Sequence, residues 1–225
     1  MENNNFDGKS SSKSVWITCL VVFLFFVLQH YFRRFGQPIP NIFLNVMNKS
    51  IAFTSFTMIS AAILTGSFVK IWPKKWESKV HYIKSFGILG FILSFIHILI
   101  SVMMFSASYY PDYFTPENKM TAVFALSLLL GSAAFVYFMA VSFNLLSNII
   151  QKHGTIKALN NIIYIFLLGH IFILKYDELL DKNSWANGLP SGHFVGFLLT
   201  IVVIIFYVTA MFKGKSKSDK TKENR

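Results

Sequence analysis

The feature that most constrains this chain is a membrane-length apolar segment with a histidine near its middle. Between Lys84 and Asp112 lie 27 residues without a charged side chain, and a helix needs about 20 apolar residues to cross the hydrocarbon core of a bilayer. The segment therefore predicts a spanning helix that contains His97. Because an ionisable side chain at that depth is expensive, it usually faces the protein interior and marks a functional site.

Apolar runs of similar character recur along the chain. Hydrophobic residues make up 54% of the sequence and charged residues only 14%, a composition that excludes an ordinary soluble domain. We therefore expect an all-α membrane protein, a six-helix transmembrane bundle over residues 15–212. A disordered cytoplasmic tail (1–14) should precede it and a basic cytoplasmic tail (213–225) should follow. The predicted spans cover residues 15–32, 50–69, 85–111, 120–144, 158–174 and 193–212.

Between the first two spans, Pro38 and Pro40 predict a connector over residues 35–48 that is non-helical or lies at the interface. After the second span, Trp72 and Trp76 stand beside several lysines, a pattern typical of a helix end anchored at the membrane surface. The single cysteine, Cys19, lies inside the first apolar run, and we expect it to be a small buried hydrophobic residue.

Basic residues are distributed unevenly over the predicted loops. Fifteen lie on the side of the two termini and six on the other side, so the positive-inside rule places the N and C termini in the cytoplasm. We expect a multi-pass protein of the cell inner (plasma) membrane. The net charge of +11 then reflects topology and attraction to anionic lipid, and we expect no nucleic-acid partner.

Two histidines fall at the same predicted depth. His97 follows Lys84 by 13 residues and His170 follows Lys157 by 13 residues, on two helices that both run outward. At about 1.5 Å per residue both rings lie roughly 20 Å from the inner boundary. Such a pair can ligate a haem iron from opposite faces. The alternative is that each ring makes a neutral hydrogen bond to a backbone carbonyl or a serine on a neighbouring helix.

The other four histidines lie nearer the predicted boundaries. His81 and His153 fall in inner loops, where we expect water around them, and His30 and His193 lie near the outer boundary, within reach of water or headgroups. A second, inner haem held by His81 and His153 is conceivable, but these residues would lie at the membrane edge.

Several segments resemble a known family, the ferric-reductase-like transmembrane domains, and above all the haem-binding membrane subunit of the bacterial periplasmic methionine sulfoxide reductase system. SFGILGFILSFIHIL (85–99) is similar to the family's third helix, with Gly87 at the family's spacing before His97. Residues 35–67 are similar to its proline-containing first loop and second helix, and MAVSFNLL with ALNNIIYIFLLGHIFIL is similar to its fourth-to-fifth-helix region. The likeness extends over about residues 15–212.

The resemblance implies a haem b protein that transfers single electrons. The haem, with His97 and His170 as iron ligands, would take electrons from a quinol or a flavin reductase on the inner side. It would pass them to a periplasmic or external acceptor, as an electron-transfer subunit of an oxidoreductase, and a quinone or flavin could accompany it. The chain lacks a Gly-rich dinucleotide fingerprint, so it needs a separate electron donor.

Two departures from the family pattern change what is expected. Asn160 stands where the family's Leu-His-x-Leu-Val-Tyr motif has histidine, which favours one haem over two. Lys79 and Lys84 replace the usual arginines, and lysine cannot clamp a propionate bidentately. A haem-less membrane scaffold of the same fold is therefore an alternative.

A rival interpretation rests on Pro190-Ser191-Gly192-His193, the PSGH motif of lipid phosphatases related to type 2 phosphatidate phosphatase. That family also needs an Arg-Pro motif upstream and a Ser-Arg with a nucleophilic histidine downstream. No arginine here precedes a proline or follows a serine, and no histidine follows His193. The tetrapeptide is equally expected of a loop that ends with Ser191 as the cap of the sixth span.

Overall fold

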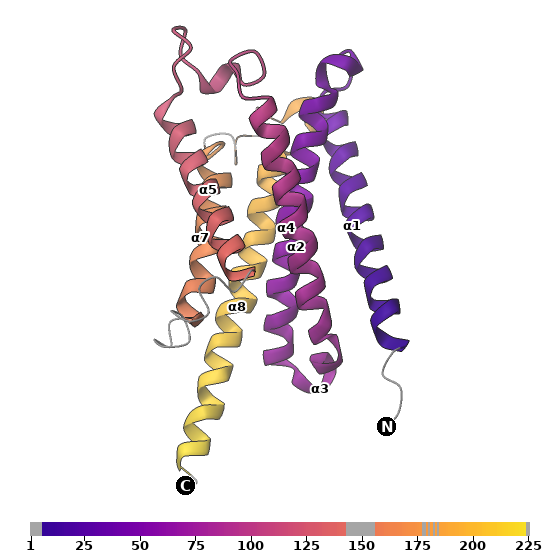
Figure 1. Ribbon diagram of the computed structural model, residues 1–225, viewed down its shortest axis with the longest axis vertical. Helices are drawn as coiled ribbons and strands as arrows, with labels where there is room; N and C mark the ends of the chain where they lie inside the picture. Colours follow the sequence, from indigo (N-terminus) through magenta and orange to yellow (C-terminus); the bar gives the residue numbers. More distant parts are fainter. Residues whose placement is uncertain are drawn as a thin grey trace. The chain divides into compact units, whose positions relative to one another are not determined.

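The computed structural model describes residues 6–142, 156–176, 179, 181, 183 and 185–223. Over these residues the chain is helical, and its only β pairing is an isolated bridge between Phe114 and Met120. The prediction of an all-α fold is confirmed for this part of the chain. The helices, shown in Figure 1, are α1 (Phe6–Phe32), α2 (Ile39–Ile71), α3 (Pro73–Trp76), α4 (Val80–Met103), α5 (Ala122–Ser142), α7 (Ile156–Ile173) and α8 (Gly192–Glu223).

Helix length and composition fit a multi-pass membrane protein. Five segments of the described chain are long and apolar enough to cross a bilayer, and α7 contributes a shorter apolar stretch, Tyr164–Ile173. The predicted end of the fourth span near residue 144 lies outside the described residues. The five longer segments are Lys13–Phe32, Ile39–Ile71, Pro73–Met103, Ala122–Ala140 and Gly192–Lys213.

Two helix boundaries differ from those expected. The connector predicted over residues 35–48 is non-helical only as far as Pro38, because Pro40 lies in the first turn of α2, where a missing N–H costs nothing. The third span ends at Met103 and not at residue 111. Turns and a short 3-10 helix, Pro111–Tyr113, fill the remainder of that apolar run.

Both tails are more helical than predicted. Helix α1 begins at Phe6, within the segment expected to be disordered, and α8 continues to Glu223 through the basic tail. Each extension lengthens an existing helix, so it avoids the nucleation step that makes short isolated helices unstable.

The chain divides into two compact units, of which the first comprises residues 1–97 and 198–225. Here α1 and α2 lie side by side, and α2 also contacts α4 (Figure 1). Val15, Cys19, Met58 and Leu89 form a small apolar core in which the thiol of Cys19 is free and buried, as predicted. At the end of α2, Lys213 of α8 donates a hydrogen bond of 2.8 Å to the carbonyl of Ile71.

Helix α2 is unusual in the number of hydroxyl side chains that it buries. Ser50 and Thr54 are fully buried, and each donates to the carbonyl four residues earlier in the same helix at 2.7 Å. Thr65 does the same at 2.8 Å. Because each hydroxyl donates its hydrogen bond within its own helix, it can lie in apolar surroundings and needs no partner on another helix or in water.

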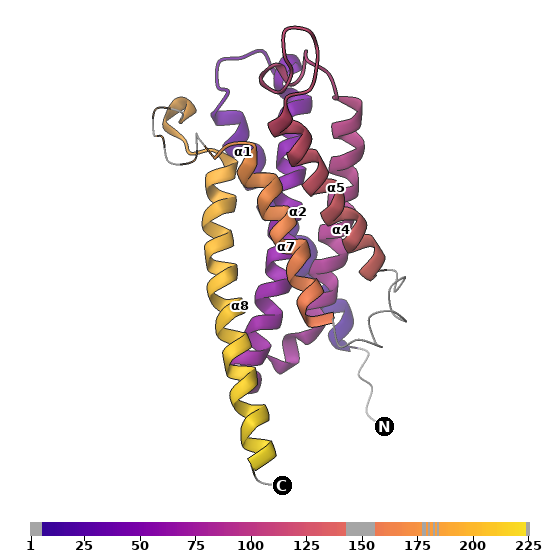
Figure 2. The ribbon, with the colours of Figure 1, turned by 90° about the vertical axis from the view of Figure 1, so that its left-hand side faces the viewer.

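The second unit covers residues 98–197 and is built on α5 and α7, which run alongside each other (Figure 2). The two helices approach closely at glycines: a Cβ on Gly169 would lie 2.9 Å from Leu130 Cδ1. Aromatic side chains pack around Phe124 at the start of α5, including Tyr113 with ring centroids 4.6 Å apart. At the start of α8, Ser191 Oγ accepts a hydrogen bond of 3.2 Å from the N–H of Phe194, so the predicted cap is confirmed.

Candidate functional site

His97 lies on a stripe of α4 that faces α2. The stripe also contains Gly90 and Ser94, which are seven and three residues earlier and so share one side of the helix. Ser55 of α2 donates to the carbonyl of Gly90 at 2.8 Å and lies 2.6 Å from the hydroxyl of Ser94. Two turns away along the same pair of helices, His97 Nδ1 lies 2.8 Å from Oδ1 of Asn48.

The contact with Asn48 selects the tautomer of a neutral His97 ring. An amide oxygen can only accept, so in the neutral ring Nδ1 carries the proton and the lone pair is on Nε2. Asn48 is itself only 2% exposed, and α2 and α4 pack closely here because a Cβ on Gly90 would lie 2.7 Å from Ile59 Cγ1. The ring of His97 is thus held by a buried acceptor on a neighbouring, tightly packed helix.

His170 on α7 is held in a comparable way by α5. Its Nδ1 lies 2.8 Å from the main-chain carbonyl oxygen of Ser127 and 2.9 Å from the Ser127 hydroxyl. The same hydroxyl donates to the carbonyl of His170 at 3.0 Å. A carbonyl can only accept, so Nδ1 of His170 is the donor and its lone pair also belongs to Nε2.

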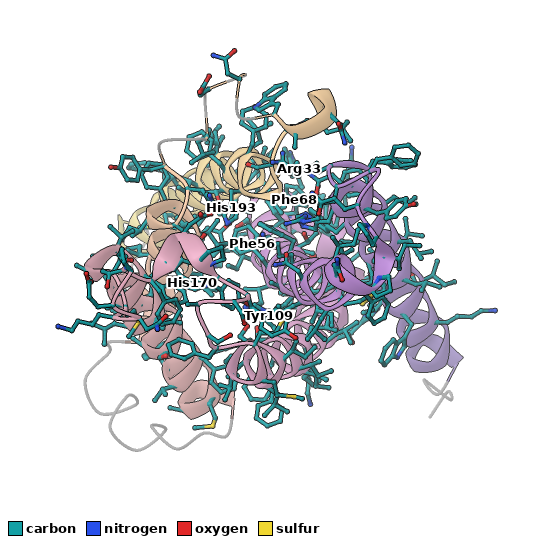
Figure 3. The ribbon with its side chains drawn as sticks, turned by 90° about the horizontal axis from the view of Figure 1, so that it is seen from above. Arg33, Phe56, Phe68, Tyr109, His170 and His193 are labelled. Carbon is teal, nitrogen blue, oxygen red and sulfur yellow. The ribbon has the colours of Figure 1, made fainter. Side chains whose placement is uncertain are left out.

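Gly131 of α5 allows the ring of His170 to pack against the helix backbone. A Cβ built on Gly131 would lie 2.9 Å from His170 Nδ1 and 3.1 Å from its Cε1, closer than real side chains approach. His170 is labelled in Figure 3, where it lies beside the pink ribbon of α5. Glycine at position 131 is therefore the residue that lets α5 reach the imidazole with its own main chain.

His97 belongs to the first unit and His170 to the second, and each is described within its own unit. The sequence prediction that the two rings meet across one cofactor stays a prediction. The structure does bring each of them to a specific oxygen acceptor on a neighbouring helix. For His170 this is the backbone carbonyl and serine that the alternative interpretation expected, whereas for His97 it is an asparagine side chain.

The environment of His30 differs from the prediction. We expected water or headgroups around it, but it is only 3% exposed, and its ring packs against both Phe26 and Phe53, which also contact each other. Its Nε2 lacks a hydrogen-bond partner among the described residues. The reason is the packing of α1 on α2.

Nearby, Arg34 donates a hydrogen bond of 3.1 Å to Oδ1 of Asn45. Burial, and then the charge of Arg33, lower the pKa of the Arg34 guanidinium.

The remaining histidines provide less evidence of a functional role. His81 is exposed, as expected, and His153 lies outside the described residues, so the less favoured alternative of a second haem held by these two is not tested. His193 is half-buried at the first turn of α8. No group of three or more histidine, cysteine or carboxylate side chains that could hold a metal ion occurs in the described chain. A haem held by two axial imidazoles does not require such a group.

Asn48 and Ser127 are the site residues that sequence reasoning missed. Asn48 stood in the segment that we interpreted as an interfacial connector, although its spacing of seven residues from Ser55 matches the spacing of His97 from Gly90. This equal spacing was the feature of the sequence that could have indicated a contact between Asn48 and His97. Ser127 carries no such signal, because His170 contacts its main-chain carbonyl, which any residue provides.

Together these features define a class: an all-helical, multi-pass membrane protein with two histidines that are each oriented through Nδ1 by an oxygen on a neighbouring helix. Neither a comparison with protein-family models nor one with curated proteins finds a match for this chain.

Proposed function

We propose that this protein binds haem b in the membrane and transfers electrons across it, and that His97 and His170 would hold the haem iron. The main support for the proposal is the hydrogen bond that Nδ1 of each imidazole makes. In both, Nδ1–H donates to an oxygen acceptor, of Asn48 and of Ser127 respectively, which leaves the lone pair on Nε2. Histidines that ligate metals characteristically donate their other ring N–H in this way.

The predicted depth of the two histidines also fits a haem. Both histidines follow a basic residue by 13 positions on helices of the same predicted direction, so they are expected at one depth. The bound iron would supply one-electron chemistry between its ferric and ferrous states. The residues of the chain hold the two imidazoles through Nδ1, so Nε2 of each neutral ring is the nitrogen that would ligate the iron.

The proposal includes an electron donor and an acceptor outside this chain. With the termini on the inner side of the plasma membrane, a quinol or a flavin reductase would deliver electrons there, and a periplasmic or external acceptor would receive them. Two other functions remain as competitors. One is a haem-less membrane scaffold of the same fold, and the other is a lipid phosphatase that uses His193, although the capping bond of Ser191 already accounts for part of its motif.

A reduced-minus-oxidised absorbance spectrum of the purified protein tests the proposal directly. The protein is expressed with a haem precursor in excess and purified in detergent. We expect the sharp visible bands of a low-spin haem b in the native protein. His97→Ala and His170→Ala should each remove most of this absorbance, because each deletes one of the two ligands.

His81→Ala is the matched control, since His81 is an exposed histidine at the start of α4. It should leave the bands unchanged. A colourless native protein, or full absorbance in either ligand variant, would overturn the haem proposal in favour of the scaffold. Release of phosphate from a lipid phosphate, abolished in His193→Ala, would favour the phosphatase.

A further inference from the structure

A cavity of about 490 Å³ lies in the first unit, at the end of α2 that is joined through α3 to α4. Figure 1 shows α3 at this end of the unit, opposite the connection between α1 and α2. Four helical segments contribute to its wall, together with the 3-10 turn Glu77–Lys79. The lining residues are Ser14, Thr65, Lys75, Trp76, Lys79, Tyr82 and Phe86. The volume is in the range of pockets that hold small molecules.

The wall of this cavity combines aromatic rings with positive charge. Tyr82 and Phe86 stack with ring centroids 5.9 Å apart, and the Lys79 ammonium lies 5.7 Å from the centre of the Tyr82 ring. Lys75 adds a second ammonium. In the described part of the chain no carboxylate lines the cavity, so its charge suits an anion.

One end of the cavity is lined by lysines and the other end lies further inside the helices. Both lysines belong to the short segment that joins two membrane-length helices, whereas Thr65 and Phe86 lie about two turns inside α2 and α4. Trp76 of α3 packs on Phe68 of α2 with ring centroids 4.8 Å apart. Lysine and tryptophan at the end of a span are typical of the headgroup level of a membrane.

We propose that this cavity binds an anionic phospholipid, with its phosphate between Lys75 and Lys79 and its glycerol and first acyl carbons against Trp76, Tyr82 and Phe86. Lysine is a suitable ligand because it presents a compact ammonium to phosphate without requiring a fixed bidentate geometry. A lysine near an anionic membrane surface contributes about 1 kcal/mol to attraction. Losing one lysine should therefore weaken lipid retention about fivefold.

Native mass spectrometry of the whole protein tests this proposal. The protein is reconstituted into nanodiscs with equal amounts of phosphatidylglycerol and phosphatidylcholine, and the lipids retained after release are counted. We expect phosphatidylglycerol to be retained in preference to phosphatidylcholine. Lys75→Ala and Lys79→Ala should each lower this preference about fivefold, and Lys79→Arg should restore most of it, because a positive charge returns.

Lys74→Ala is the matched control. Lys74 is an exposed neighbour of Lys75 that does not line the cavity, so it should leave retention unchanged. An equal loss in Lys74→Ala, or equal retention of the two lipids, would overturn the proposal, as would displacement of the lipid by millimolar inorganic phosphate, which would identify a site for free phosphate. Haem absorbance is expected to be the same in all these variants, so the outcome is independent of the electron-transfer proposal.

Discussion

At the scale of single residues, the two candidate ligands are oriented by acceptors of different kinds. His97 depends on a side-chain oxygen, Oδ1 of Asn48. His170 depends first on a main-chain oxygen, that of Ser127, and the Ser127 hydroxyl adds a second contact. A side-chain acceptor can be deleted by substitution and a main-chain acceptor cannot, so the two histidines should respond differently to mutation.

We therefore expect Asn48→Leu to be more damaging than Ser127→Ala. The first change leaves the part-buried Nδ1–H of His97 without this acceptor, at a cost of about 1–3 kcal/mol, and should also lower haem retention. The second leaves the carbonyl of residue 127 in place for His170. Thermal unfolding in detergent measures the stability, and absorbance measures the haem. Equal losses in both variants would contradict the account of how the rings are held.

Gly131→Ala should displace the ring of His170. The added methyl group would lie 2.9 Å from His170 Nδ1, so the imidazole or α5 must move, and overpacking of this kind costs about 1–3 kcal/mol. Gly87→Ala is the control, because a Cβ at Gly87 meets no atom within 4 Å. It should be neutral or slightly stabilising, since alanine favours a helix interior. Near-identical unfolding temperatures for the two variants would show that the close contact is not required.

At the scale of helices, the contact between α2 and α4 keeps one register over two turns. Asn48 meets His97 at one level, and Ser55 meets Ser94 and the carbonyl of Gly90 at the next. The absence of a side chain at Gly90 lets the helices approach closely enough for these bonds, as is typical of helix pairs in membranes.

Gly90→Ala should loosen this pair of helices. Its methyl group would lie 2.7 Å from Ile59 Cγ1 and 3.2 Å from the Ser55 carbonyl oxygen, and a backbone atom cannot give way as a side-chain tip can. We expect a loss of about 1–3 kcal/mol and weaker protection of the α2 amides in hydrogen exchange. Gly66→Ala, whose Cβ would meet Ile83 Cδ1 at an ordinary 3.7 Å, serves as control. Equal protection in the two variants would count against the close packing at Gly90.

At the scale of the whole molecule, the uneven distribution of lysine and arginine should determine orientation. The side that holds the termini also holds the segment between α2 and α4, with Lys74, Lys75 and Lys79. The positive-inside rule predicts that this side is cytoplasmic. Two exposed serines, Ser78 in that segment and Ser108 between α4 and α5, offer positions at which to test it.

Cysteine labelling in intact cells should report this orientation. In a Cys19→Ala background, which removes the one native thiol, Ser108→Cys should react with a membrane-impermeant maleimide added outside. Ser78→Cys should react only after the cells are opened. The Cys19→Ala protein alone is the blank. Labelling of Ser78→Cys in intact cells would mean that the orientation is inverted.

The sequence by itself determined the class of fold and the rough positions of the spans. Long apolar runs bounded by lysine, proline and tryptophan can bury their backbone polar groups in a bilayer only as helices, so α4 and α7 could be predicted from composition alone. Helix ends were less predictable. Pro40 was compatible both with a connector and with the first turn of α2, and only the packed helix distinguishes the two.

Tertiary structure alone decided how each histidine is satisfied. His30, His97 and His170 have the same side chain, but packing places the first against two phenylalanine rings and the others against oxygen acceptors. The physical reason is that a hydrogen bond depends on which atoms of neighbouring helices come within about 3 Å. That distance follows from glycines such as Gly90 and Gly131, which let the helices approach, and from the register between them.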